Sequence, residues 1–450
     1  MSGNQNLSGS DIPILEGLDK TDVERTLAGV RRFLRNSRWV GKSNFYAGGV
    51  SGKLRISQPD TPAKKRNLAQ FIASSAALHA SDGWSYLGRS ISTLLCGDAH
   101  RSLHLAYYAE LRAALSILAS AGIGVFDKKH YVISDVNSTR KLTTGQGTHV
   151  AAWLALKHWA GRPGSGNLFA SIVRPEGLTL EQWFHSHGGA SALAPQAQSW
   201  LMQWGMDLEF SINDREARNE SSYRPDGIPD TWMCQPAEVL DFVEDMWNLL
   251  EPGAGSEFAN LDLHILRLAS EKAYRGQSGK TANAASQGYQ RFVEGLLRPH
   301  GFTDSTRNRL RDFLLRNSVP NDPIVFLQAQ RIPKHSQSDV YAVLARAVFL
   351  LRIASGSTQQ LFSKAGIEAS ELEFWKTEVG VSRGLWAPNS EPTHLTDLWA
   401  DVEDSIGEVR TLAASAADAL DSFHGLAINL PGAMKVFSSH ERVGLWSMNV

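Results

Sequence analysis

Hydrophobic residues recur along this 450-residue chain mainly at three- and four-residue intervals. That period places apolar side chains on one face of a helix, so the pattern predicts a mainly α fold, a multi-helical bundle. The helices are expected at about residues 21–36, 64–79, 82–96, 99–121, 148–160, 195–219, 236–250, 258–274, 285–298, 304–317, 338–355 and 395–424. Thr21 and Glu24 have the spacing of a capping box, which predicts that they open the first helix.

Strand patterns are rare. Residues 124–133 (GVFDKKHYVI) carry two short β-rich runs around a polar turn, which predicts a small hairpin. A second hairpin is expected around residues 50–56. Loop-forming clusters of glycine, proline and polar residues occur at 136–148, 161–167, 224–230, 252–256, 319–323 and 387–392.

The cluster at 224–230 is the best candidate for a domain boundary, because one helical series ends there and another follows. We therefore predict a mobile leader at 1–20, a helical domain at 21–230 that contains the hairpin near 124–133, and a second helical region at 235–450. The leader has neither the basic start nor the apolar run of a secretory signal.

Composition narrows the class of protein. Hydrophobic residues make up 42% of the chain and charged residues 20%, which is typical of a globular protein. The two cysteines, Cys96 and Cys234, are too few for a disulfide framework and indicate a reducing compartment. The longest apolar stretch, 341–354, is interrupted by two arginines and is too short to span a bilayer. We expect a cytoplasmic protein with no membrane segment.

Charge is distributed unevenly although the net charge is −1. Residues 24–66 hold eleven Lys or Arg and two acids, whereas residues 368–421 hold twelve acids and three bases. One interpretation is that the basic segment binds RNA or single-stranded nucleic acid and the acidic segment a protein partner. The other is that the two segments lie against each other or are simply solvated. A homo-oligomer is compatible with either.

The basic segment combines cations with aromatic rings. Bases that neutralise phosphates and rings that stack on nucleobases are what a single-stranded nucleic-acid surface requires. The ligand-binding candidates here are Arg31, Arg32, Arg35, Arg38 and Trp39, and the neighbouring rings are Phe33, Phe45 and Tyr46.

No complete catalytic, nucleotide or metal motif occurs. Residues 276–281 end like a phosphate-binding loop, but Tyr274 stands where its first glycine should be. His185 and His187 lack a third ligand at a defined spacing. Asp127 and Lys129 have the spacing of a metal-dependent nuclease strand without a clear second acid. We therefore predict no metal and no cofactor.

The predicted helix at 99–121 carries unusual polar residues along its apolar stripe. Its stripe consists of His104, Tyr107, Tyr108, Leu111, Leu115 and Leu118, with Arg112 at its edge and Glu110 on the opposite flank. One interpretation is that Arg89, His104, Tyr108 and Arg112 border a polar ligand-binding pocket. The alternative is a core helix whose polar groups satisfy neighbouring loops and helix ends.

The stretch that closes the predicted helix at 195–219 supplies the last candidates. Arg218 and Asn219 are followed, after three residues, by Tyr223. This spacing resembles the R-x4-H motif of HEPN-type helical proteins. The helix with Tyr107 and Tyr108 that ends in Gly-Ile-Gly resembles a helix of YaaC-like proteins. The resemblance implies a HEPN-like N-terminal half, and many members of that superfamily are ribonucleases or bacterial defence components.

Tyr223 stands where the HEPN motif has histidine. The family's arginine and histidine act together on RNA, and tyrosine, with an ordinary pKa near 10, is a poor general base at neutral pH. We therefore expect a non-catalytic HEPN-like binding or regulatory component of a bacterial stress or anti-phage defence system, which binds RNA or single-stranded nucleic acid. One alternative is an active, metal-independent ribonuclease toxin using Arg218, Asn219, Tyr223 and His104. Another is a helical scaffold for protein partners.

Overall fold

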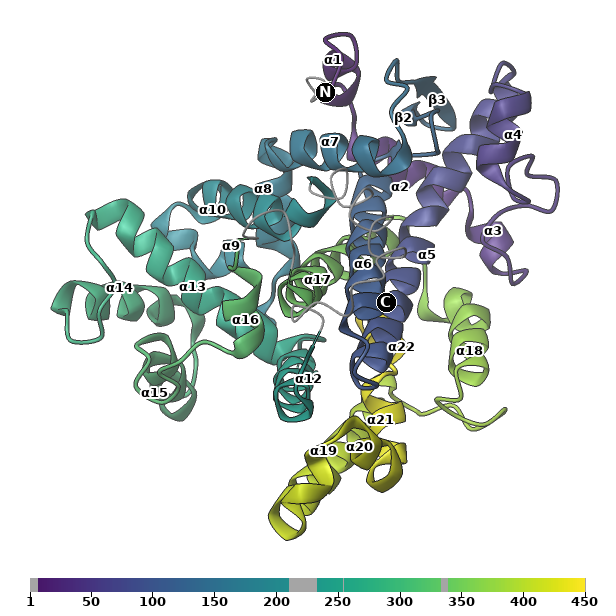
Figure 1. The fold of residues 1–450 in the computed structure, drawn as a ribbon. Helices are drawn as coiled ribbons and strands as arrows, with labels where there is room; N and C mark the ends of the chain where they lie inside the picture. Colours follow the sequence, from purple (N-terminus) through teal and green to yellow (C-terminus); the bar gives the residue numbers. More distant parts are fainter. Residues whose placement is uncertain (1–6, 210–232, 254, 333–338, 450) are drawn as a thin grey trace, which may run out of the picture.

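The computed structural model describes residues 7–209, 233–253, 255–332 and 339–449 (Figure 1). Within these ranges the protein is mainly helical, as the hydrophobic pattern predicts, with one small three-stranded sheet. Three long helices form its centre: α5 (Pro62–Leu94), α6 (Ala99–Ser120) and α17 (Val340–Lys364).

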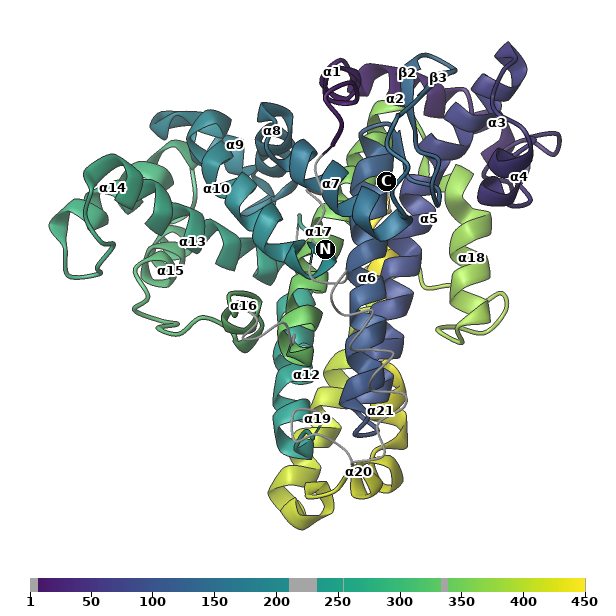
Figure 2. The same ribbon diagram turned by 45° about the horizontal axis from the view of Figure 1, so that its top comes forward.

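The central helices are positioned by their ends and by one close approach. Thr61 caps α5 by accepting a hydrogen bond from the Lys64 backbone N–H, and Asp98 caps α6 in the same way. A turn at 95–98 lays α6 alongside α5, and α17 packs against both (Figures 1 and 2). Gly83 permits this packing, because a methyl group there would press on Leu351 of α17.

Shorter helices surround this centre. They are α1 (Ile12–Glu16), α2 (Lys20–Ala28), α3 (Arg31–Leu34), α4 (Val50–Ile56), α7 (Thr148–Ala160), α8 (Pro163–Ile172), α9 (Leu180–Trp183), α10 (Gly189–Trp204), α12 (Pro236–Leu250), α13 (Ala259–Ser278), α14 (Gln287–Leu297), α15 (Asp304–Leu314), α16 (Ile324–Ala329), α18 (Glu373–Ser382), α19 (Trp399–Ser415), α20 (Phe423–Asn429), α21 (Pro431–Phe437) and α22 (Glu441–Ser447). Figures 1 and 2 show α13–α15 projecting to one side, α3 and α4 at the opposite corner, and α19–α21 at the lower end.

The sheet confirms one predicted hairpin. β1 (Ile123–Gly124) pairs antiparallel with β2 (Tyr131–Asp135), with Ile123 opposite Val132. The sequence did not predict β3 (Ser138–Lys141), which lies inside a loop-forming cluster and pairs with β2 across a tight turn at Asn137, where φ is 59°. Asparagine tolerates this left-handed conformation better than most residues.

The second predicted hairpin, at 50–56, is wrong, because these residues form α4. Val50 and Leu54 stand four residues apart, so they share one helical face, and Leu54 is the buried anchor. The predicted helix at 21–36 is also divided, into α2 and α3. Asp19, rather than Thr21, caps α2, since its carboxylate accepts a hydrogen bond from the Thr21 N–H.

Three further boundaries differ from the prediction. The helices expected at 64–79 and 82–96 are one continuous helix, α5. α8 begins inside the predicted loop at 161–167, with Pro163 at its first position, where a missing N–H costs nothing. α10 starts at Gly189 and carries Pro195 in its early turns.

One hydrophobic cluster connects most of the chain. Its buried residues run from Leu15 to Met448 and include much of α5, α6 and α17. Among the described helices, α17 alone is long and apolar enough to cross a membrane. Within the protein, however, 94% of its most apolar 18-residue stretch is buried. The apolar stretch at 341–354 is therefore part of a buried core helix. The proposed domain boundary at 224–230 lies outside the described residues.

Candidate functional site

Two tyrosines on neighbouring central helices form a stacked pair. The ring centroids of Tyr86 on α5 and Tyr108 on α6 lie 5.5 Å apart at 25°, and both side chains are half-buried. The guanidinium carbons of Arg89 and Arg112 lie 5.4 and 5.9 Å from the Tyr86 centroid. We call these four residues the aromatic–arginine cluster. The structure thus brings the predicted residues Arg89, Tyr108 and Arg112 together through Tyr86.

Two histidines contact the same tyrosine. The His104 centroid lies 5.0 Å from that of Tyr108, in an edge-on arrangement, and the His149 centroid lies 6.2 Å away. His149, in the first turn of α7, stacks on Tyr107, whose hydroxyl oxygen lies 2.5 Å from His149 Nδ1. His104 therefore belongs to the neighbourhood predicted for it, and His149 is an addition.

The cluster is electropositive. Arg112 lies 3.1 Å from His79 Nδ1 and 3.7 Å from the Asp82 carboxylate. Burial and the Arg112 charge lower the pKa of His79 to about 3, so its neutral ring accepts the hydrogen bond from Arg112. Arg89 is exposed, and no carboxylate of the described residues lies within ion-pair distance of it. Within the described ranges, Arg89 therefore offers a positive charge with no acidic partner.

Glu110 faces the interior instead. Its carboxyl group is fully buried near Asp207, which follows α10 and receives two hydrogen bonds from Arg346, at 2.5 and 2.8 Å. Burial, and then the Asp207 charge, raise the pKa of Glu110 well above its ordinary value, and Arg346 only partly opposes this. Burial therefore favours the protonated form of Glu110, which is a core residue and lies outside the surface cluster.

Part of the basic segment is paired internally. Arg31 Nε and Arg35 Nε lie 2.9 and 2.7 Å from carboxylate oxygens of Glu371, and Arg31 also reaches Glu368 at 3.2 Å. For these residues the oppositely charged segments lie against each other, which was one of the two interpretations. Trp39 packs its ring among Phe362, Phe374 and Trp375.

The other rings of this segment also face the protein. Tyr46 is fully buried, and Phe45 is covered by Lys53 and Lys64 at 5.0 and 5.8 Å from its centroid. Arg32 lies 4.7 Å from the centroid of Phe33. These rings are therefore poorly placed to stack on nucleobases, whereas the exposed Lys and Arg side chains of the segment could still contact phosphates.

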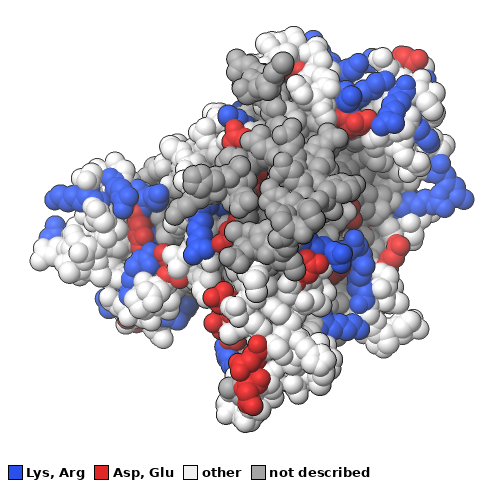
Figure 3. Space-filling view, viewed as in Figure 1, with Lys and Arg blue, Asp and Glu red and all other residues white. Residues whose placement is uncertain are grey.

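Several cations of the segment have no acidic partner within the described part of the chain. We call Arg32, Arg38, Lys42, Lys65 and Arg66 the basic patch. Lys and Arg side chains gather at the upper right of Figure 3, where Figure 1 places α3 and α4. At 1.5 Å per residue, Arg66 and Tyr86 are about 30 Å apart along α5. The basic patch and the aromatic–arginine cluster are thus separate surfaces.

The remaining sequence candidates divide into two groups. Arg218, Asn219 and Tyr223 lie outside the described residues. Asp127 pairs with Arg55 at 2.7 Å, and Lys129 donates a hydrogen bond to the Leu54 carbonyl oxygen. Both residues with nuclease-like spacing therefore hold the hairpin against α4. Among the residues that the structure describes, no three His, Cys, Asp or Glu side chains are grouped to hold a metal ion.

Sequence reasoning missed Tyr86 and His149 as members of the site. Tyr86 lies within the stretch that drew attention, but only the packing of α5 on α6 shows that it meets Tyr108. His149 is 42 residues from Tyr107, and no local motif marks that contact. No family model, curated protein or solved structure matches this chain.

Proposed function

We propose that this protein is a non-catalytic, HEPN-like binding component that holds single-stranded RNA at the aromatic–arginine cluster, in a bacterial stress or anti-phage defence system. The observation that carries the proposal is the stacked, partly exposed Tyr86–Tyr108 pair, flanked by Arg89 and Arg112. Single-stranded nucleic acids bind to such pairings of aromatic faces with cations.

The chemistry of the cluster suits RNA. Stacking of a base on an aromatic ring contributes about 1–3 kcal/mol, and guanidinium groups match phosphate oxygens in two-pronged geometry. The basic patch, about 30 Å away along α5, would add contacts that depend on charge rather than sequence.

The test is fluorescence anisotropy with a labelled single-stranded RNA at two salt concentrations. We expect Tyr108→Ala to weaken binding about tenfold, since one stacking face is lost, and Tyr108→Phe to preserve it. Lys65→Ala with Arg66→Ala should mainly reduce the dependence on salt. Arg275→Ala, an exposed arginine on α13, is the matched control. Equal affinity of the wild type and Tyr108→Ala would refute the proposal.

A second candidate, a metal-independent ribonuclease, is favoured by one observation. His104 and His149 both contact Tyr108, whose stacked partner Tyr86 lies beside Arg89 and Arg112. Two imidazoles could move protons at a phosphodiester bound there. The same RNA, incubated with the wild type, His149→Ala and Arg218→Ala in the presence of a chelator, separates the two functions. RNA that remains intact with the wild type supports binding alone.

A further inference from the structure

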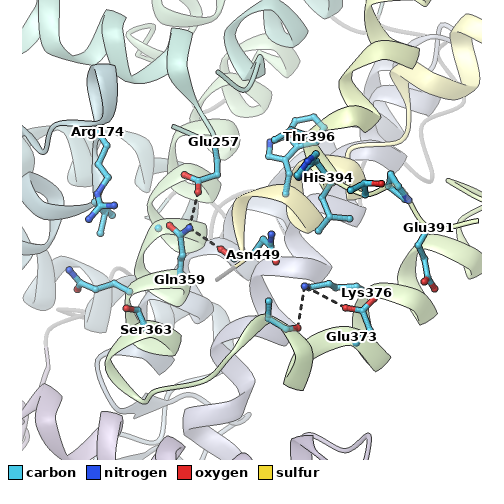
Figure 4. Close-up of a pocket in the computed structure, with 18 of the residues that line it drawn as sticks. Arg174, Glu257, Gln359, Ser363, Glu373, Lys376, Glu391, His394, Thr396 and Asn449 are labelled. Carbon is cyan, nitrogen blue, oxygen red and sulfur yellow. Dashed lines mark hydrogen bonds and ion pairs between the residues drawn. The ribbon is translucent and has the colours of Figure 1, made fainter. Parts of the chain in front are cut away.

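A cavity of about 520 Å³ lies where the start of α2 meets α6, α7, α8 and α17. Its volume is within the range of small-molecule sites. Gln360 of α17 and Ser171 of α8 line both this cavity and a larger neighbouring cleft of about 1080 Å³, which Figure 4 shows. The larger cleft carries three basic and three acidic side chains, so its charges select no class of ligand. The smaller cavity contains one unusual amine.

That amine belongs to Lys20, the first residue of α2. Its Nζ donates a hydrogen bond to Gln360 Oε1, a neutral acceptor, and no carboxylate of the described residues lies within ion-pair distance of it. Nε2 of Gln360 in turn donates to Ser171 Oγ at 2.9 Å, which turns the amide oxygen toward the lysine. Buried lysines normally have a charged partner, whereas partly buried Lys20 is held in place by neutral groups.

The surroundings of Lys20 disfavour its charged form. Gln360 and Lys364 stand four residues apart, so they share one face of α17, and this brings a second ammonium group toward Lys20. Burial lowers the pKa of Lys20, Glu24 one turn along α2 opposes this in part, and the Lys364 charge adds to the lowering. Lysines in such places act as nucleophiles near neutral pH, because only the free amine has a lone pair to donate.

The rest of the lining suits a small and mainly apolar molecule. Ile117, Trp159 and Leu168 supply apolar surface. Arg162 donates to two backbone carbonyl oxygens at the end of α1, at 2.8 and 3.0 Å, and so holds the fold together. Glu181, the one carboxylate of the lining, is exposed. Of the groups that line the cavity, the amine of Lys20 is the strongest nucleophile.

We propose that Lys20 forms an imine with a small aldehyde or ketone that enters this cavity. The nitrogen attacks the carbonyl carbon and forms a C–N bond, and the carbonyl oxygen takes up both hydrogens of the amine and leaves as water. The step needs neither an oxidant nor a reductant. Gln360 is a positioning residue, because its hydrogen bond orients the nitrogen. The site shares no residue with the RNA surface proposed above and is independent of it.

Reductive trapping of the full chain tests the proposal. Acetaldehyde is added at pH 7 with cyanoborohydride, which reduces an imine to a stable ethylated lysine, and mass spectrometry of the peptides gives the rate at each lysine. A pKa lowered by one unit gives about ten times more free amine at neutral pH. We therefore expect Lys20 to be ethylated at least about tenfold faster than Lys272, an exposed lysine on α13.

Gln360→Glu separates a reactive lysine from a merely structural one. This variant keeps the size of the side chain and puts a carboxylate against the Lys20 amine, and an opposite charge raises the pKa of a lysine. Ethylation of Lys20 should then fall about tenfold, while that of Lys272 stays unchanged. The wild-type comparison needs no variant to fold. Ethylation of Lys20 no faster than that of Lys272, or equal rates at Lys20 in the wild type and in folded Gln360→Glu, would overturn the proposal.

Discussion

Glu110, Asp207 and Arg346 place two acids and one base in the interior, and all three are at least 96% buried. One guanidinium can neutralise only one carboxylate at short range, and Arg346 donates two hydrogen bonds to the Asp207 carboxylate. Glu110 is then most stable with its proton retained, because a second buried charge would need a second cation. The polar residues of α6 thus have two roles, one at the surface and one in the core.

The protonation of Glu110 predicts a difference in pH dependence between the wild type and Glu110→Gln. The folded pKa of Glu110 is raised, so the unfolded chain releases this proton first and wild-type stability falls as pH rises above about 4.5. Between the unfolded and the folded pKa, each rise of one pH unit lowers the free energy of unfolding by about 1.4 kcal/mol. Gln cannot titrate, so the variant should gain stability relative to the wild type as pH rises above about 4.5. Urea unfolding measures this, and parallel curves would contradict it.

Some residues of the candidate site could be predicted from the sequence and others could not. Arg89, Tyr108 and Arg112 were predicted as neighbours because helical spacing puts Tyr108 and Arg112 on adjacent turns. Trp39 was predicted to face a ligand, but it packs on rings from residues 362–375, which no local pattern links to it. Contacts of this kind depend on how helices pack, and periodicity describes only one helix at a time.

At the scale of the helix, two glycines that look alike in the sequence should respond in opposite ways to substitution by alanine. A methyl group at Gly88 of α5 would overlap the backbone carbonyl oxygen of Ser438, whereas one at Gly276 of α13 would meet open space. Gly88→Ala should therefore destabilise the protein by about 1–3 kcal/mol, as overpacking does. Gly276→Ala should stabilise it by about 0.5–1 kcal/mol, since alanine loses less backbone entropy in a helix.

Thermal and urea unfolding of the two variants measure these changes of opposite sign. Circular dichroism at low denaturant serves as the check that both remain helical. A stabilising Gly88→Ala would show that α5 and the segment after α21 are not in the tight contact described here.

The elements themselves were largely readable from the sequence. α6, α7 and α12 lie within one residue of the predicted spans, because their apolar periodicity is strong and their ends carry breakers. α5 was predicted in two parts because Ser81, Asp82 and Gly83 interrupt its apolar stripe. That interruption is where α17 approaches, so a tertiary contact, rather than propensity, decides the continuity of the helix.

On the scale of the whole molecule, Glu371 connects the N-terminal and C-terminal parts of the chain. It is 5% exposed and accepts hydrogen bonds from Arg31 and Arg35, some 340 residues earlier. Burial alone would raise its pKa, but these bonds and that from the Glu368 N–H outweigh burial and lower it. The charged form is therefore the one that stabilises the fold.

Glu371→Gln should lower the free energy of unfolding by about 1.5–3 kcal/mol at pH 7, the range for hydrogen bonds to a charged group. Because the folded pKa is lowered, this stabilisation is present above about pH 4.5 and is lost as pH falls through the folded pKa. The difference between wild type and variant should therefore shrink in acid. Glu378→Gln, an exposed acid on α18, is the control. Equal stability of the Glu371 and Glu378 variants at pH 7 would contradict the prediction.

The position of α17 against α5 has a consequence for how the protein is made. Trp84 on α5 donates its indole N–H to Ser355 on α17, which is 271 residues later. A ribosome adds about 5–20 residues per second, so α5 and α6 wait on the order of 15–55 s for the helix that covers them. During synthesis their apolar faces are open to chaperones and to neighbouring nascent chains. The final burial of these faces therefore waits until α17 has been synthesised.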